Sequence, residues 1–408
     1  MNMQHPTIHW DAKKNLFICV DPRVSLAAAS VWFRAGSRFD ARGKEGVAHL
    51  FEHLLLRGAV AKDPNAYLIE QEARGVVGSA SVNYETSYTF SIGAVADAGA
   101  MIRTLLQRSL DRTEVSSTAL RTELQAVRGE IREAHNDAIS EVRILSNTAV
   151  WPESELGRNL YGTPESLAKI RVADLQQFWN DRYQAALTVC VVPTEEAAQQ
   201  IRRISMKTAA LPEVAPAVLR PVISEVAQAS DREGVALCVA YRVSGQSDWK
   251  SHAVAAVVRD YLTNFWSSRL NQELRSKKAY AYWVRGETTH LADTGVLRIL
   301  LETDAANVSR CRKRIAQEID TLRAGKCDAA LLRTCKKMVV LAQQRALSDP
   351  EELLWWYGWP TALGVKPMTT DAWVELVQSI TARDVTKFAN TWLQPEQCTV
   401  ALVGAVQA

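Results

Sequence analysis

The chain lacks the features that mark membrane-spanning, secreted and nucleic-acid-binding proteins. In its 408 residues no apolar run approaches the roughly 20 residues that a membrane helix needs. The first ten residues, Met1 to Trp10, contain no apolar segment of the kind that directs secretion. The formal net charge is only +3, and no basic block suggests a nucleic-acid surface. We therefore expect no membrane and no nucleic acid among the partners of this protein.

Paired cysteines are also missing. The seven cysteines are scattered along the chain, and no two of them form a C-x-x-C pair. An odd and unpatterned set fits buried thiols in a reducing compartment, and it argues against a disulfide framework or a cysteine zinc site. The cysteine content thus predicts a cytoplasmic protein.

The length, the composition and an internal sequence repeat favour two related domains. A chain of 408 residues is too long for one ordinary domain, and an apolar fraction of 47% can fill two cores. The segment Ile170–Phe178 is echoed by Ile380–Phe388, and strand-like runs follow them at Leu187–Val192 and Cys398–Val403. Within each half, strand-like and helical segments come in groups. We predict an α+β fold with two homologous domains, each a mostly antiparallel sheet with helices packed on one face.

A proline-containing segment separates the two halves. Residues 209–221 include three prolines, which prevent regular secondary structure. The sequence thus predicts an N-terminal domain over residues 1–208, a linker over 209–221 and a C-terminal domain over 222–408.

The most informative motif is the pentapeptide His49-Leu-Phe-Glu-His53. On a helix His49 and His53 lie one turn apart, so both imidazoles can bind one zinc ion. Glu52 shares that face and could reach a water on the metal, as in the inverted zinc motif H-x-x-E-H. The flanking residues are apolar, and burying two imidazoles and a carboxylate among them is costly unless a metal pairs with them. Two hydrogen-bonded core histidines are the alternative.

A zinc site with an open position for water needs a third protein ligand. The best candidates lie on a predicted helix over residues 117–135, where Glu123 and Glu130 share nearly one face. Either glutamate could be the ligand, and the other could orient a ligating histidine. A solvated charged face is the alternative interpretation of this helix.

Taken together, residues 36–58 and the two glutamates resemble the pitrilysin/insulinase family of inverted-motif zinc metallopeptidases. The bacterial branch that is similar to mitochondrial-processing peptidase fits best. The resemblance implies a set of roles around one Zn²⁺ ion: His49, His53 and Glu130 as metal ligands, Glu52 as general base, and Glu123 as a supporting residue.

A second stretch, Leu274–Tyr282, is similar to a downstream family motif. There an arginine and a tyrosine seven residues apart bind the substrate backbone, and the matching residues are Arg275 and Tyr282. A guanidinium and a phenol can hold a peptide carbonyl and stabilise the oxyanion that develops on it. A basic helix end followed by an aromatic strand is the alternative. The sequence departs from the family pattern at two positions. Ser79 replaces a substrate-binding asparagine of the family, and Ala279 replaces a glycine.

The resemblance implies a zinc-dependent metalloendopeptidase that cleaves short or unfolded peptides, including leader or precursor segments. A non-catalytic structural or partner subunit of the same fold is the alternative from another class, and an unrelated zinc hydrolase is a third. Family members of this length carry two of the four domains that close a chamber. The resemblance therefore implies a homodimer, or a heterodimer with a related family chain.

Two further segments bear on how a substrate could be bound. The Tyr84–Ile92 segment alternates like a strand, and at a sheet edge it could pair with an extended peptide, although an interior position is favoured. The aromatic cluster at residues 353–360 could line a substrate chamber, but packing is favoured because most aromatic runs are core.

Overall fold

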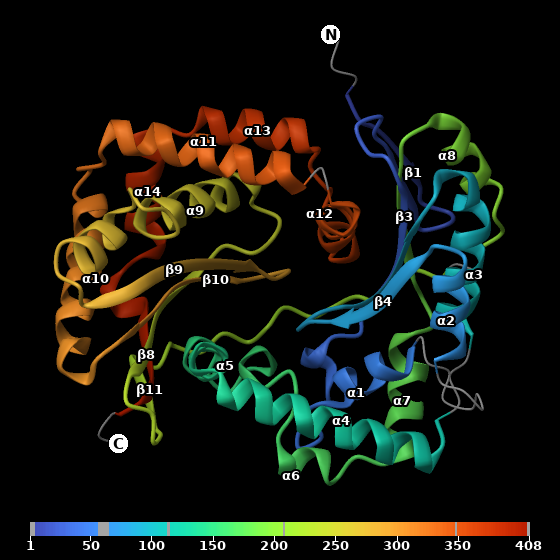
Figure 1. The fold of residues 1–408 in the computed structure, drawn as a ribbon, viewed down its shortest axis with the longest axis horizontal. Coiled ribbons are helices and arrows are strands. Elements are labelled where there is room, and N and C mark those ends of the chain that lie inside the picture. The colour runs from blue at the N-terminus through green and yellow to red at the C-terminus, as the bar shows by residue number, and fades with distance from the viewer. Residues whose placement is uncertain (1–4, 56–64, 112–114, 207–208, 347–348, 406–408) are drawn as a thin grey trace. The chain divides into compact units, whose positions relative to one another are not determined.

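The structure is a computed structural model that describes residues 5–55, 65–111, 115–206, 209–346 and 349–405. The chain forms two compact units (Figure 1). The first comprises Met1–Ile131, Asn159–Ala215 and Gln344–Thr369, and the second comprises Arg132–Arg158, Pro216–Gln343 and Thr370–Ala408. Each unit contains one mostly antiparallel sheet with helices packed on it, so the chain has the α+β fold that the grouping of its segments predicts.

The described part of the first unit contains a six-stranded sheet in the order β1-β2-β6-β3-β5-β4. Its strands are β1 (Thr7–Asp11), β2 (Leu16–Val20), β3 (Ala27–Phe33), β4 (Val77–Val82), β5 (Ser87–Gly93) and β6 (Leu187–Val192). The β2–β6 pair is parallel, and the other pairs are antiparallel. Strand β5 lies between β3 and β4, which confirms the interior position predicted for residues 84–92. Strands β1 and β4 are the two edges of this sheet.

The helices of the first unit begin with α1 (Val47–Leu55), the helix of the pentapeptide. The sequence pattern predicts this helix around residues 46–57, and residues 56 and 57 lie outside the described residues. Helices α1, α3 and α8 pack on one face of the sheet, and α7 packs on α1. The other helices of this unit complete the set: α2 (Ala66–Ala73), α3 (Ala98–Leu110), α4 (Ser117–Asn136), α6 (Pro164–Leu167), α7 (Val172–Arg182), α8 (Glu195–Arg202) and α12 (Pro350–Ala362).

Helix α12 covers the opposite face of the first sheet. Successive side chains of a strand point to opposite faces, and on β3 Phe33 packs on Tyr183 whereas Trp32 packs on Trp355 of α12. The ring centroids of Trp32 and Trp355 lie 5.5 Å apart, and Gly358 brings the α12 backbone against the Trp32 indole. The aromatic cluster at residues 353–360 is therefore packed against a sheet, as predicted.

The described part of the second unit contains a five-stranded sheet in the order β7-β11-β8-β10-β9. Its strands are β7 (Glu225–Ala229), β8 (Val235–Val243), β9 (Ala281–His290), β10 (Gly295–Thr303) and β11 (Cys398–Gly404), and the β7–β11 pair is the parallel one. Helix α5 packs on β8 and β11, and α9, α10 and α14 also pack on this sheet. The helices are α5 (Ala138–Val150), α9 (Trp249–Leu262), the π-helix η4 (Asn271–Ser276), α10 (Val308–Arg323), α11 (Ala329–Ala346), α13 (Thr370–Ser379) and α14 (Ala382–Trp392).

Short 3₁₀ helices complete the described structure: η1 (Ser37–Phe39), η2 (Val95–Asp97), η3 (Glu155–Gly157), η5 (Ala305–Asn307) and η6 (Pro395–Gln397). Among the described residues, no helix combines the length and the apolar character that crossing a membrane would require.

The internal echo corresponds to a helix and a strand in each unit. Helices α7 and α14 each have an aspartate as their third residue, Asp174 or Asp384, whose carboxylate accepts the backbone N–H three residues earlier at 2.8 Å. In both repeats a phenylalanine follows the aspartate by four residues, and both Phe178 and Phe388 are buried. Each unit also takes a segment from the other half of the chain, which brings α12 into the first unit and α5 into the second. The division at residues 209–221 stays a prediction.

Candidate metal centre

The start of α1 is fixed by a buried carboxylate. Asp40 accepts the backbone N–H groups of Gly46 at 2.7 Å and of Ala48 at 2.9 Å. The first N–H groups of a helix have no acceptor within it, so a carboxylate there satisfies them and favours helix formation. Gly46 has a φ of +99°, and a Cβ there would lie 2.9 Å from the carbonyl oxygen of Tyr161. These contacts set the direction in which His49 and His53 leave the helix.

Both histidines present Nε2 to one carboxylate. Glu130 Oε2 on α4 lies 3.1 Å from His49 Nε2, and Glu130 Oε1 lies 3.4 Å from His53 Nε2. Ligand atoms around a tetrahedral zinc ion at ordinary bond lengths lie about 3.3 Å apart. The two separations between histidine and carboxylate are therefore close to those of ligands around one ion.

The geometry separates the two glutamates that the sequence left equivalent. Glu123 Oε2 lies 3.0 Å from Nδ1 of His53, on the side of the ring away from Glu130. A carboxylate that accepts the Nδ1–H of a histidine leaves the Nε2 lone pair for a metal. Glu130 thus lies beside both Nε2 atoms and Glu123 beside Nδ1 of His53, and the roles of metal ligand and orienting residue stay predictions.

Glu52 lies beside this cluster but farther from the imidazole nitrogens than Glu130 does. Its Oε2 atom is 3.8 Å from His53 Nε2, and the nearest metal-binding atoms of His49, Glu52 and His53 all lie within 4.8 Å of one another. A carboxylate at this distance can reach a molecule bound between the three ligand side chains without itself being one of the nearest donors.

The cluster carries a negative potential. Burial lowers the pKa of His53, but the hydrogen bond to Glu123 and the charges of Glu52 and Glu130 outweigh it, and the pKa is raised overall. Three carboxylates around two imidazoles favour a cation between them. Two imidazole nitrogens and a carboxylate oxygen are also the donor set of many catalytic zinc sites, so the residues present fit a zinc ion.

The edge strand of the first sheet forms one wall of the same cavity. A cavity of about 460 Å³ is lined by His49, Glu52, His53 and Glu130 together with Ser79, Ala80, Ser81 and Val82 of β4. Ser79, predicted as a substrate-binding residue, thus lies in the cavity wall. Tyr161 also lines it, and its ring centroid lies 5.0 Å from that of His49. The sequence offered no metal-binding or catalytic motif that would have placed Tyr161 there.

The second pair of predicted site residues comes together in the second unit. The guanidinium carbon of Arg275 lies 5.2 Å from the ring centroid of Tyr282. Arg275 belongs to the π-helix η4, which ends at Ser276. Ala279, three residues beyond that end, has a φ of +52° and donates its N–H to the Arg275 carbonyl at 3.1 Å. This left-handed C-terminal residue is usually glycine, which explains why the family has glycine at that position.

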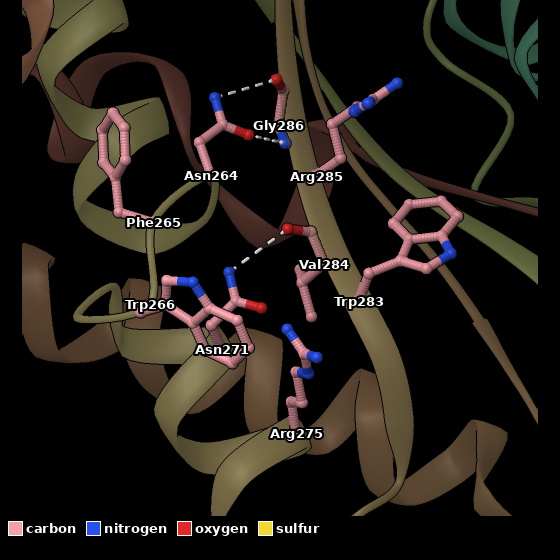
Figure 2. A pocket seen from close by; sticks show the side chains of 9 residues that line it. All are labelled: Asn264, Phe265, Trp266, Asn271, Arg275, Trp283, Val284, Arg285 and Gly286. Carbon is pink, nitrogen blue, oxygen red and sulfur yellow. Dashed lines mark hydrogen bonds between the residues drawn. The ribbon is translucent and has the colours of Figure 1, made fainter.

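A second aromatic residue, Trp266, joins Arg275 and Tyr282. The guanidinium carbon of Arg275 lies 3.9 Å from its ring centroid, and both residues line a second cavity of about 450 Å³ (Figure 2). Sequence reasoning missed Trp266 because a single tryptophan in a loop belongs to no motif.

Comparison with known proteins identifies the family. Residues 18–164 match the family described as Insulinase (Peptidase family M16), and residues 169–339 match Peptidase M16 inactive domain. The chain belongs to this pitrilysin/insulinase family of peptidases, as its motifs predict.

Individual relatives agree with this assignment. The chain is 23% identical over 308 residues to the Bacillus subtilis protein named Uncharacterized zinc protease YmxG, covering 74% of this chain and 75% of the relative. It is 21% identical over 407 residues to the Arabidopsis thaliana protein named Probable mitochondrial-processing peptidase subunit beta, covering 93% of this chain and 75% of the relative. Its fold matches the crystal structure of a protease from Helicobacter pylori with a TM-score of 0.85 at 16% identity, covering 98% of this chain and 99% of the other.

Proposed function

We propose that this protein is a zinc-dependent endopeptidase that cleaves short or unfolded peptides, including leader or precursor segments. The observation that carries the proposal is the approach of His49 Nε2 and His53 Nε2 to the two oxygens of Glu130. Relatives named as zinc proteases support it.

The roles of the cluster follow from these positions. A zinc ion held by His49, His53 and Glu130 would supply an activated water and a polarised substrate carbonyl. Glu52 takes the proton of the attacking water and passes it to the leaving amine. Glu123 holds the imidazole of His53 in the tautomer that leaves Nε2 free for binding.

The edge strand suggests how a substrate would bind. Strand β4 pairs with β5 on one side only, and it lines the cavity of the cluster. An extended peptide can add to such an edge through main-chain hydrogen bonds. A folded protein satisfies its own backbone groups internally, so unstructured segments are the substrates we propose, with Ser79 among the residues that contact them.

Arg275 and Tyr282 are proposed to hold a peptide carbonyl and to stabilise the oxyanion. We propose that this pair acts on a peptide held by the cluster of a neighbouring subunit, in a homodimer or in a heterodimer with a related family chain. The name of the Arabidopsis relative, a subunit beta, supports an assembly of this kind. A cytoplasmic location is part of the same proposal.

Metal content and activity of single variants test the assignment. We expect one zinc ion per chain by elemental analysis, little metal in His49→Ala or Glu130→Gln, and full metal in Glu52→Gln without peptide cleavage. Glu133→Gln is the matched control, because Glu133 is an exposed glutamate on the same helix as Glu130, and it should keep both metal and activity.

The same experiment separates the peptidase from a non-catalytic partner subunit. A non-catalytic partner subunit would cleave no peptide alone, and the activity of its complex with a related chain would survive Glu52→Gln. Cleavage by Glu52→Gln at the wild-type rate would show that Glu52 is not the general base.

A further inference from the structure

Two large aromatic side chains are exposed around Arg275. Trp266 is 67% exposed and Tyr282 is 78% exposed, so neither is held by core packing. The guanidinium carbon of Arg275 lies 3.9 Å from the Trp266 ring centroid, which is a van der Waals contact with the ring face. A guanidinium in face contact with a ring keeps its N–H donors, because they point outward in the guanidinium plane.

The charge of Arg275 is not neutralised by a neighbouring carboxylate. Within the described ranges, Arg275 takes part in no ion pair. The carboxylate nearest to it in sequence, Glu273, is bound instead by Lys277 at 2.7 Å and by Arg314 at 3.0 Å. The N–H donors of Arg275 are therefore left for an acceptor that is not part of this arrangement, such as a peptide carbonyl oxygen.

The loop that carries Trp266 is fastened to the edge of the second sheet. Strand β9 is the last strand of that sheet. The carboxamide of Asn264 accepts the N–H of Gly286 at 2.8 Å and donates to the Gly286 carbonyl at 3.3 Å, as a neighbouring strand would (Figure 2). Asn271 donates to the carbonyl of Val284 at 3.3 Å. These bonds anchor the loop on both sides of Trp266.

The backbone conformation of Asn264 and the lack of a side chain at Gly286 allow the loop to lie close to strand β9. Asn264 has a φ of +48°, a left-handed conformation that asparagine tolerates better than most residues. A Cβ on Gly286 would lie 2.6 Å from Cγ of Arg259, so only glycine fits under the loop. The side chain of Gln272 also donates to the Trp266 carbonyl at 2.5 Å. The position of Trp266 is therefore determined by the sheet edge.

We propose that Trp266 is a positioning residue that holds the guanidinium of Arg275 flat and leaves its N–H edge for the carbonyl oxygen of a bound peptide. This inference rests on the proposed peptidase function, and it adds a residue that acts on the substrate only through Arg275. Asn264 and Asn271 position Trp266 in turn, because they anchor its loop to β9.

A double-mutant cycle tests the coupling between the two residues. The probe is the fluorogenic peptide that the wild-type protein cleaves fastest in an unstructured-peptide library. We expect Trp266→Ala to lower kcat/KM at least about fivefold, because an exposed cation–π contact is lost and Arg275 gains freedom. Trp266→Phe should stay within about twofold of wild type. In an Arg275→Ala background, Trp266→Ala should cause no further loss. Trp10→Ala, which removes an exposed tryptophan of β1, is the control.

A substrate-free measurement keeps the inference separate from the peptidase proposal. In protein labelled with ¹⁵N-arginine, the Nε–Hε signal of Arg275, assigned with Arg275→Lys, should be shifted by the ring current of Trp266. Trp266→Ala should remove that shift and Trp266→Phe should keep part of it. An unmoved signal in Trp266→Ala, or equal losses of kcat/KM from Trp266→Ala with and without Arg275, would overturn the inference. A responsive signal in a protein that cleaves no peptide would overturn only the peptidase proposal.

Discussion

Substitution of Gly358 by alanine should destabilise the first unit, although the same change usually stabilises a helix. Gly358 lies inside α12, where alanine is favoured over glycine by about 1 kcal/mol. An added Cβ would lie 2.5 Å from Cζ2 of Trp32, whereas carbon atoms in contact lie roughly 3.5 to 4.0 Å apart. One of the two groups would have to move by more than about 1 Å.

Trp32 cannot easily make that movement. It is fully buried, its Nε1 donates to Ser30 Oγ at 2.7 Å, and its ring stacks on Tyr88 with centroids 4.2 Å apart. Overpacking of a core typically costs about 1 to 3 kcal/mol, and displacement of α12 would also expose apolar surface. After subtraction of the helix gain of about 1 kcal/mol, we expect a net loss of up to about 2 kcal/mol in the free energy of unfolding.

Gly99→Ala is the matched control for this prediction. Gly99 lies in α3 of the same unit, and an added Cβ there would make only ordinary contacts, 3.6 Å or more from side chains. We expect that variant to be more stable than wild type by about 0.5 to 1 kcal/mol. Thermal unfolding should thus shift in opposite directions for the two variants, and hydrogen exchange should place the Gly358→Ala effect in β3.

The double mutant sharpens the test. Trp32→Phe alone should destabilise by leaving a cavity, but it should cost less in the Gly358→Ala background, where the smaller ring relieves the clash. Equal stability of Gly358→Ala and Gly99→Ala would refute the reasoning, because α12 would then not pack against Trp32.

Four further predictions concern strain, pH, assembly and substrate choice. Ala279→Gly should raise the free energy of unfolding by about 0.5 to 1 kcal/mol in denaturant titrations, since Ala279 has a φ of +52°. Burial lowers the pKa of His290 to about 4 in the folded protein. In the unfolded chain this pKa is about 6.5, so the unfolded chain binds more protons than the folded protein between pH 6.5 and pH 4. The free energy of unfolding should therefore fall by about 3 kcal/mol as the pH is lowered through this range. His290→Asn should flatten that profile, and an unchanged slope would contradict it. Mixing inactive Glu52→Gln with strongly impaired Arg275→Ala should raise the peptidase activity well above that of either variant alone if the two sets of residues act from different subunits; no such gain after proven subunit exchange would exclude this arrangement. Unstructured peptides should be cleaved and a folded protein without loose tails should not, and rapid internal cleavage of the folded protein would argue against β4 as the binding edge.

Much of the candidate site could be predicted because its geometry is local. The positions of His49, Glu52 and His53 follow from the period of a single helix, so their common face was readable from spacing alone. The strands at Leu187–Val192 and Cys398–Gly404 were predicted within one residue, because short apolar runs between breakers have few other conformations available.

The spacing of residues in the sequence could not assign separate roles to Glu123 and Glu130. Both residues lie on nearly one face of α4, and spacing within that helix cannot say which nitrogen of His53 each one meets. That depends on how α4 lies against α1. The contacts of Glu123 with Nδ1 and of Glu130 with Nε2 belong to the tertiary structure. Without the family resemblance, the sequence would have left the two roles open.

The sequence by itself determined several of the elements, the pentapeptide motif and the family, since each of these depends on residues close together in the chain. Only the tertiary structure decided which sheet α12 covers and which ring lies over Arg275. Helix α12 carries apolar residues on all sides, so no polar face in its sequence indicates its neighbours. Trp266 reaches Arg275 because Asn264 pairs with Gly286 on a strand edge that forms only when the sheet is complete. Contacts between segments distant in the chain are selected by the packing of the whole unit, and no local pattern encodes them.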